Sequence, residues 1–361
     1  FAAEFFGRPS SKLKVIGITG TNGKTTTAHL LASVLRQHGL VTAVFGTLSG
    51  ARTTPEATDL QRSLANEFER GCNAVVMEVS SHALSLCRVA GTRFAETIFT
   101  NLGQDHLDFH GSMDEYFSAK SKLFTQQYTD TCIVNRDDHY GAKLIVILNE
   151  KNEVNLETFG INDASQIVAE VDQLSFVWRG EKVQLVTGGY FNVMNALAAA
   201  NAAAKLGVAT SDIAKGLAAA DAIAGRFESV SVGQNFGVVV DYAHTPEALQ
   251  NVLDATRKLI TDSGRVIVVF GCGGDRDHQK RPRMGKVASD LADVVFITSD
   301  NPRLEDSSVI AKQIEVGCNH ALKKPIYVIL DRRDAIAQAF SVACSGDIVV
   351  IAGKGHESTQ T

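Results

Sequence analysis

The segment GITGTNGKTT, residues 17–26, combines residue types that bind phosphate groups. Backbone N–H groups of a glycine-rich turn and of the helix start that follows it form an anion site. Lys24 can reach terminal phosphates, and the Thr25 hydroxyl can ligate Mg²⁺. Only two residues separate Gly20 from Gly23, so the loop is a shortened variant of the P-loop. Its position between an apolar strand and a helix favours a nucleotide site over an ordinary turn.

Two Thr-Pro-Glu-Ala motifs, at residues 54–57 and 245–248, have the composition of helix starts. We expect each threonine to cap a helix, each proline to take its first position, and each glutamate to face the positive end of the dipole. Thr53 and His244 precede these motifs and are free for other contacts. Asp241 ends the strand before the second motif, where a carboxylate either contacts a ribose or a phosphate-bound metal, or simply closes a turn. The residues alone leave both roles open.

Potential metal ligands follow two further apolar strands. Glu78 ends one of them, and the segment NLGQDHLDFH, residues 101–110, follows the next. Oxygen and imidazole ligands suit Mg²⁺ or Mn²⁺ better than a metal that prefers thiolates. A single histidine here is more often structural than a ligand, and only the density of ligand types in this segment favours metal binding.

Lys120 lies on the apolar face of a predicted helix. Ser112 and Glu115 form a capping box, and the apolar stripe that follows includes Tyr116 and Phe117. A lysine on such a stripe either extends its ammonium to water or does chemistry. Burial lowers the pKa of the amine, and a neutral amine can add CO₂ to become a carbamate, which is an anionic oxygen ligand. The local sequence by itself favours extension to water.

Short apolar segments alternate with helical patterns along the chain, as in a parallel sheet covered by helices. We expect helices at 25–38, 191–205 and 246–259, and strands at 14–19, 74–79, 97–100, 236–241, 265–270, 294–298, 326–329 and 347–352. The fold class is therefore predicted to be α/β. A central P-loop-type parallel-sheet ATPase domain at residues 1–225 should precede a smaller Rossmann-like α/β domain at residues 226–361.

Composition excludes several classes of protein. The 361 residues are 45% hydrophobic and carry a net charge of -5, which argues against nucleic acid or an anionic membrane as the main partner. No apolar run approaches the ~20 residues that span a bilayer. The N-terminus does not have the pattern of a signal peptide. The six cysteines are scattered without a CxxC pair, which argues against a disulfide framework or a zinc site. We expect a cytoplasmic protein.

Ten motifs, taken in order, resemble those of the Mur ligase family over almost the whole chain. They are GTNGKTT, TTPEATDLQ, EVSSHAL, NLGQDHLDFHG, AKSKLF, GRFE, DYAHTPEAL, GCGGDRD…KRP, DNPR and GKGHE. The resemblance is closest to the diaminopimelate-adding type. It implies that the γ-phosphate of ATP passes to the D-glutamyl carboxylate of UDP-N-acetylmuramoyl-L-alanyl-D-glutamate. The amine of meso-2,6-diaminopimelate then attacks the acyl phosphate, in a step of peptidoglycan precursor synthesis.

The resemblance also implies roles for individual residues. ATP would be bound by Gly20, Thr21, Asn22, Gly23, Lys24, Thr25, Thr26, Asn195, Arg226 and Asp241. Of two Mg²⁺ ions, one would be held by Thr25 and Glu78 and the other by His106 and a carbamylated Lys120. This reverses the local expectation for that lysine and makes Lys24, Glu78, His106 and Lys120 the catalytic group. The muramoyl dipeptide would contact Thr53, Thr54, Ser80 and Arg88. The amino acid would contact Arg281, Asp300, Asn301, Pro302, Arg303, Gly353 and Glu357.

The sequence departs from the family pattern at several points. The uridine-binding domain of the family has no counterpart before FAAEFFGRPS, so the sequence has the character of a fragment. Leu86 stands where relatives often carry glutamine. A lysine-adding ligase, another Mur or folylpolyglutamate-type ligase, and a non-catalytic nucleotide-binding fragment are the alternatives. DNPR favours diaminopimelate, because Arg303 can pair with the distal carboxylate that lysine lacks. We expect a monomer with small-molecule substrates.

Overall fold

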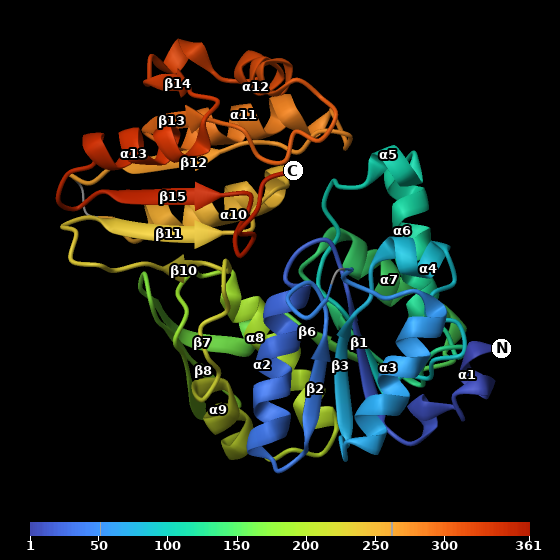
Figure 1. Cartoon of the computed structure of the whole chain (residues 1–361). Coiled ribbons are helices and arrows are strands. Elements are labelled where there is room, and N and C mark those ends of the chain that lie inside the picture. Colours follow the sequence, from blue (N-terminus) through green and yellow to red (C-terminus); the bar gives the residue numbers. More distant parts are fainter. Residues whose placement is uncertain (51, 261–262) are drawn as a thin grey trace.

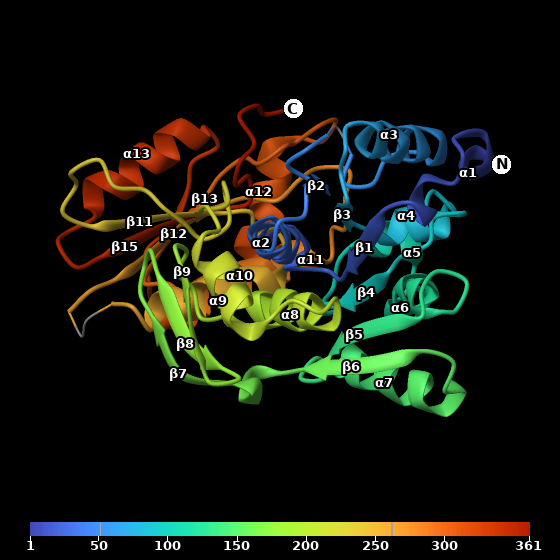
Figure 2. The same ribbon diagram turned by 90° about the horizontal axis from the view of Figure 1, so that it is seen from below.

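A six-stranded parallel sheet forms the centre of the first part of the computed structural model, which describes residues 1–50, 52–260 and 263–361. Its strands are β1 (Lys14–Thr19), β2 (Thr42–Phe45), β3 (Ala74–Glu78), β4 (Glu96–Phe99), β5 (Thr131–Asn135) and β6 (Asn155–Phe159). They lie in the order β2-β3-β1-β4-β5-β6, which can be followed in Figure 2, while Figure 1 shows β2, β3 and β1 side by side. The register pairs Ile18 with Glu78 and Thr19 with Phe99, so β1, β3 and β4 end at the same edge.

Helices cover both faces of this sheet (Figure 2). On one face lie α2 (Lys24–Gln37), α8 (Asn192–Lys205) and α9 (Thr210–Ala218). On the other lie α3 (Ala57–Glu69), α4 (Ser81–Ser85), α6 (Met113–Ser121) and α7 (His139–Lys151), while α1 (Ala2–Phe5) and α5 (Leu107–His110) are single turns. The buried alanines of α8 are small enough to let its backbone approach α2 and the sheet closely.

The second part has its own six-stranded sheet. Its strands are β10 (Glu228–Ser229), β11 (Gly237–Asp241), β12 (Val266–Phe270), β13 (Val294–Ile297), β14 (Ile326–Val328) and β15 (Ile348–Ala352), in the order β10-β11-β15-β12-β13-β14. Only the β10–β11 pair is antiparallel. One face is covered by α10 (Pro246–Arg257), α11 (Lys280–Leu291) and α12 (Ser307–Val316), the other by α13 (Arg332–Val342). The predicted α/β class is confirmed.

One segment departs from the predicted alternation of strands and helices. The strands β7 (Ala164–Ala169), β8 (Leu174–Trp178) and β9 (Glu181–Leu185) form a separate antiparallel sheet that the sequence analysis missed. Leu174, Phe176 and Trp178 alternate along β8 and are buried in the core that α2 and α8 share. The outer strand β7 has no buried residue, so its sequence has little of the alternation that marks a half-buried strand.

The two Thr-Pro motifs fold differently. Thr245 caps α10 as predicted, because its Oγ1 accepts the N–H of Ala248 at 3.1 Å. The predicted cap by Thr54 is wrong, since α3 begins only at Ala57. The Thr54 hydroxyl instead donates to the carbonyl of Glu78 at 2.9 Å and accepts the N–H of Ser80. The Thr54 hydroxyl therefore bonds backbone groups at the end of β3 instead of a backbone N–H of α3.

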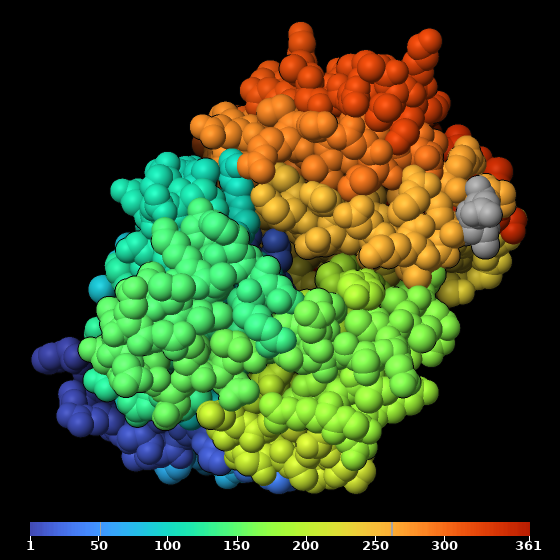
Figure 3. Space-filling model, turned by 180° about the vertical axis from the view of Figure 1, so that it is seen from behind, coloured from blue at the N-terminus to red at the C-terminus, as the bar shows by residue number. Residues whose placement is uncertain are grey.

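The two parts of the chain meet along an indented seam, with the second part, orange to red, above the first (Figure 3). Within the described residues, no helix combines the length and apolar character that crossing a membrane requires.

Glu96 is a buried carboxyl at the start of β4, away from the strand ends that face the second part. Its side chain is 2% exposed and its Oε2 has no hydrogen-bond partner. Burial raises the pKa of Glu96 to about 8, although Lys205 and Lys14 oppose the shift. The folded protein therefore holds this carboxyl in its protonated form at neutral pH.

Glu96 should make the free energy of unfolding fall as the pH rises. Between its ordinary pKa of 4.5 and its folded value of about 8, the folded state binds the proton and the unfolded state does not. The contribution of Glu96 to the free energy of unfolding is therefore largest below pH 4.5. It falls by up to ~1.4 kcal/mol per pH unit across this window. Glu96→Gln should remove that component, and urea unfolding at pH 5 and pH 8 measures it. The exposed Glu150→Gln on α7 is the control, and equal pH dependence in both variants would refute the assignment.

Candidate active site

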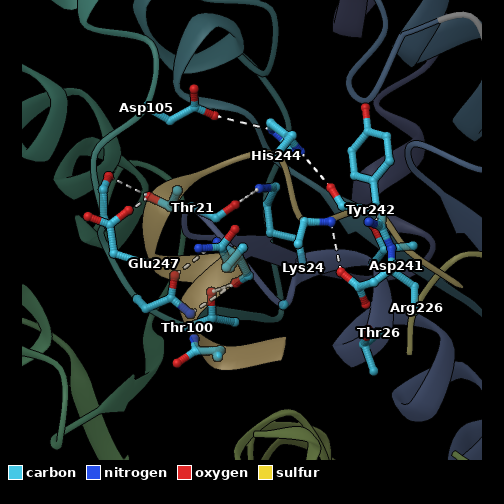
Figure 4. A pocket seen from close by; sticks show the side chains of 18 of the residues that line it. Thr21, Lys24, Thr26, Thr100, Asp105, Arg226, Asp241, Tyr242, His244 and Glu247 are labelled. Carbon is cyan, nitrogen blue, oxygen red and sulfur yellow. Dashed lines mark hydrogen bonds and ion pairs between the residues drawn. The ribbon is translucent and has the colours of Figure 1, made fainter. Parts of the chain in front are cut away.

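A cavity of about 830 Å³ lies between the two parts of the chain. The phosphate loop and the ends of β3 and β4 line it on one side (Figure 4). Residues after β11, β12, β13 and β15 line it on the other. The carboxyl ends of both parallel sheets therefore open into the same space, which is where α/β folds bind their ligands.

The phosphate loop is held in shape by its own lysine and by β4. Lys24 Nζ donates to the carbonyls of Gly20 and Thr21 at 2.8 and 2.9 Å, and burial lowers its pKa. Gly23 caps α2 with φ 85°, and a Cβ there would lie 2.3 Å from Asn195 Oδ1. Glycine is therefore required where the loop approaches α8. A phosphate group would compete with the two carbonyls for Lys24.

Thr25 and Glu78 form the best oxygen pair for a divalent cation. Thr25 Oγ1 lies 3.0 Å from Glu78 Oε1, which also accepts the N–H of Thr47 at 2.9 Å. The described residues contain no group of three or more His, Cys, Asp or Glu side chains that could hold a metal by themselves. Mg²⁺ usually takes one or two carboxylates and completes its shell with phosphate oxygens and water, so this pair fits Mg²⁺ beside a bound nucleotide.

Lys120 is buried at 1% exposure, so the local expectation that it extends to water is wrong. Its Nζ donates to the Gly20 carbonyl at 2.9 Å and lies 4.8 Å from the Tyr116 ring centre. Burial and the nearby Lys24 hold the pKa of Lys120 well below its usual range. Burial also lowers the pKa of His106 to about 3, so its imidazole is neutral at neutral pH and able to act as a ligand. His106 lines the cavity, while Lys120 lies behind the phosphate loop.

Asp105 joins the two parts, and the sequence analysis passed over it. It is 5% exposed, and its carboxylate lies 3.4 Å from Lys280 Nζ, 3.5 Å from His244 Nε2 and 3.4 Å from His106 Nε2. Burial alone would raise the pKa of Asp105, but the Lys280 ammonium and the hydrogen bond with His244 outweigh it and hold that pKa well below its usual range. Figure 4 shows Asp105 and His244 facing each other. Its signal in the sequence was its place in the segment 101–110, which is dense in potential ligands.

Five of the seven residues predicted to contact the amino acid line one end of the cavity, called here the amino-acid end after that prediction: Asp300, Asn301, Arg303, Gly353 and Glu357. Arg303 is exposed, adopts a left-handed backbone conformation with φ 53°, and donates from Nη1 to the Gly274 carbonyl at 2.6 Å. Gly353 has φ 109°, and a Cβ there would lie 2.7 Å from Asp300 Oδ2, a buried oxygen without a partner.

Arg281 and Pro302 do not line the cavity. Arg281 is fully buried, and its two terminal nitrogens each lie 2.8 Å from a carboxylate oxygen of Glu305. It also bonds Gln313 at 2.7 Å and the Gly273 carbonyl at 3.1 Å. With its terminal nitrogens already paired, Arg281 is placed to hold the loops around residues 273 and 305 rather than to touch an amino acid.

At the dipeptide end, Thr53 and Ser80 line the cavity, whereas Thr54 and Arg88 lie behind them. Arg88 pairs with Glu56 at 2.9 Å. Ser80 Oγ accepts the N–H of Ala83 and so caps α4.

At the nucleotide end, Asn195, Arg226 and Asp241 line the cavity. Arg226 donates to Thr25 Oγ1 at 3.0 Å and lies 4.4 Å from the Tyr242 ring, so the phosphate loop contacts the second part directly. Both oxygens of Asp241 accept backbone N–H groups, at 2.7 Å each, which is the turn-closing role. An apolar wall that the sequence analysis missed is formed by Ile161, Tyr190, Phe191 and Met194.

Two protein-family models match this chain, one over each of its two parts. The Mur ligase middle domain matches residues 18–203, and the Mur ligase, glutamate ligase domain matches residues 225–355. The chain belongs to the Mur ligase family. Among individual relatives, the UDP-N-acetylmuramoyl-L-alanyl-D-glutamate–2,6-diaminopimelate ligases of Syntrophomonas wolfei and Aquifex aeolicus are 41% and 42% identical to it. Each match covers 99% of this chain and 76% of the relative.

Solved structures of Mur ligases and related enzymes have the same fold. A UDP-N-acetylmuramoyl-L-alanyl-D-glutamate–2,6-diaminopimelate ligase is similar with a TM-score of 0.65 and 33% identity, over 96% of this chain and 74% of that one. A folylpolyglutamate synthase from Mycobacterium tuberculosis has a TM-score of 0.75 at 16% identity, over 98% of this chain and 91% of that one. At such low identity the second likeness shows the fold alone.

Removing the partner of Asp105 should open the cleft of this Mur ligase. Lys280→Met leaves a buried carboxylate short of its cation, which costs ~3–5 kcal/mol and therefore favours the open arrangement by a hundredfold or more. X-ray scattering with an ATP analogue should show a larger radius of gyration than the wild type. The control is Lys286→Met, an exposed lysine on the same helix. Equal radii, in proteins with equal thermal stability, would contradict a role for Asp105 in closure.

Proposed function

We propose that this Mur ligase uses ATP to join meso-2,6-diaminopimelate to UDP-N-acetylmuramoyl-L-alanyl-D-glutamate. The observation that carries the proposal is the single cavity in which the phosphate loop faces Asp300, Asn301, Arg303 and Glu357. Amide formation needs the activated carboxylate and the attacking amine within bonding distance. The relatives at 41–43% identity that bear this name support the same reaction.

The main role proposed for the first part of the chain is to neutralise the negative charge of the phosphates. Lys24 and the N–H groups at the start of α2 would bind the β- and γ-phosphates. Thr25 and Glu78 would hold one Mg²⁺, which stabilises the charge that develops as the phosphoryl group transfers. Arg226 bonds Thr25 from the second part, so the nucleotide site is complete only when both parts meet. The apolar wall at Ile161 and Phe191 is suited to the nucleotide base.

The second Mg²⁺ site depends on a modified Lys120. Its neutral amine would add CO₂, forming a carbamate and releasing one proton. The carbamate and His106 would then hold the ion. The proximity of Lys24 favours this anion, whereas the ammonium form of Lys120 is disfavoured both by burial and by the neighbouring cation.

Arg303 is proposed to select the amino acid. Its guanidinium can pair with the distal carboxylate of meso-diaminopimelate.

Lysine-adding specificity is the nearest alternative, and no observation in the cavity favours it. The second alternative is a non-catalytic fragment, which is opposed by the presence of Lys24, Glu78, His106 and Lys120. The domain limits 1–225 and 226–361, a monomeric state and a cytoplasmic location stay predictions.

A ligation assay tests the proposal directly. The protein is mixed with ATP, Mg²⁺, the UDP-muramoyl dipeptide and either labelled meso-diaminopimelate or labelled L-lysine. We expect phosphate release and a labelled UDP-tripeptide with diaminopimelate. Product with lysine alone would establish the alternative specificity, and nucleotide binding without either product would establish the non-catalytic alternative.

Lys120→Ala should abolish ligation while ATP binding persists, because only the second metal site is lost. A short-chain carboxylic acid should restore part of the rate by replacing the carbamate oxygens, and the wild-type rate should rise with bicarbonate. The matched control is Lys122→Ala, two residues along the chain and exposed. No rescue by any acid, together with no dependence on bicarbonate, would count against the carbamate.

Arg303→Ala should lower kcat/KM for meso-diaminopimelate by about tenfold to hundredfold, the range for losing one charged pair at a partly exposed site. Its preference for meso-diaminopimelate over lysine should nearly disappear, while the KM for ATP changes little. Steady-state kinetics with both amino acids measure this. If the variant keeps the wild-type preference, another residue reads the carboxylate. Arg281 is then excluded by its pairing with Glu305, leaving Arg276, which also lines the cavity.

A further inference from the structure

Lys354 lies directly behind the amino-acid end of the cavity. It is 8% exposed and does not line the cavity itself, whereas its neighbours Asn301 and Glu357 do. Its Nζ donates to Asn301 Oδ1 and to Glu357 Oε2, both at 2.9 Å. Asn301 Nδ2 in turn donates to the same Glu357 oxygen at 2.8 Å. The three side chains therefore form a closed triangle of hydrogen bonds.

This triangle fixes the orientation of both residues that face the cavity. With Lys354 on Oδ1, the Asn301 amide can turn only its Nδ2 toward Glu357. Glu357 Oε2 accepts two donors, so its Oε1, which has only the weaker contact to Tyr242 at 3.4 Å, is the oxygen left for a ligand. Burial alone would raise the pKa of Glu357, but the donors Lys354 and Asn301 outweigh it and lower that pKa.

Lys354 also contributes, together with Arg303, to the positive charge at this end of the cavity. Asp300 and Glu357 are both carboxylates, and Lys354 is the lysine that bonds Glu357 within the described chain. Arg332 lies behind them, but its guanidinium donates to the carbonyls of Ser299 and Ala352. Without the Lys354 ammonium, the potential at this end would become more negative. A more negative site disfavours a substrate end that carries a carboxylate and favours one that carries only an ammonium.

We propose that Lys354 is a specificity-determining positioning residue, which holds Asn301 and Glu357 in place and keeps the site electrostatically suited to a distal end bearing both an ammonium and a carboxylate. The inference rests on the proposed ligase function and extends it, because it adds a residue that does not contact the substrate. Meso-diaminopimelate has such a distal end, whereas lysine presents a lone ammonium there. Removing Lys354 should therefore shift selection toward lysine.

The test compares Lys354→Met, Lys354→Arg and a matched control, Lys324→Met. Lys324 is a half-buried lysine of the same part that donates three hydrogen bonds, to the carbonyls of Ser289, Asp290 and Ala292. In Lys354→Met the KM for meso-diaminopimelate should rise about tenfold or more, the effect expected for losing bonds from a charged donor. The preference over lysine should fall by a similar factor, with the KM for ATP within about twofold of the wild type. Lys354→Arg should recover part of both, since guanidinium can donate to both oxygens.

If Lys354 has a merely structural role, Lys354→Met should lower kcat or thermal stability and leave the preference between the two amino acids unchanged. The second contrary outcome is that Lys354→Met and Lys324→Met have equal effects. Either outcome overturns the inference. If the wild-type protein ligates neither amino acid, the proposed function is wrong, and so is the inference that rests on it. Wild-type protein that ligates meso-diaminopimelate, while Lys354→Met keeps the wild-type preference, contradicts the inference alone.

Discussion

Charged groups held away from water between the two parts of the chain are the constraint on which the site depends. Asp105 is buried on the first part and takes its cation, Lys280, from the second. Thr25 in the phosphate loop lies between Glu78 of its own sheet and Arg226 of the second part. Because an unpaired buried charge is costly, these groups stabilise the arrangement in which both parts close on the cavity. The same side chains therefore line the cavity and join the two parts.

The two sheets provide the rigid framework for these contacts. In each sheet the parallel strands end at one edge, and the functional residues follow those ends. Loops that begin at the ends of buried strands start from fixed points, so side chains from distant parts of the sequence reach one cavity with little freedom. The antiparallel strands β7 to β9 add core on the α8 side and take no part in the site, apart from leading toward the apolar wall at Tyr190.

At the amino-acid end, the residues that face the cavity are held by charged residues that do not. Arg281 pairs with Glu305 behind the loop that carries Arg303, and Lys354 pairs with Glu357 and Asn301. Both supporting cations are buried. A site that must distinguish two amino acids sharing the same α-amino acid group needs fixed charges, and a second layer of ion pairs is what fixes them.

The sequence by itself determined the α/β class, eight of the fifteen described strands, the phosphate loop and the family, because these depend on local apolar periodicity and on short motifs whose chemistry follows from their residue types. It also placed Lys120 on an apolar face. Only the tertiary structure decided that this lysine is buried, that Thr54 bonds the end of β3 instead of capping a helix, and that Arg281 is paired internally. It likewise decided that Asp105 pairs with Lys280 and Lys354 with Asn301, which come from segments far apart in the chain. Burial and pairing of charge are properties of neighbours in space, and no local pattern of residues specifies which distant side chain will supply the opposite charge.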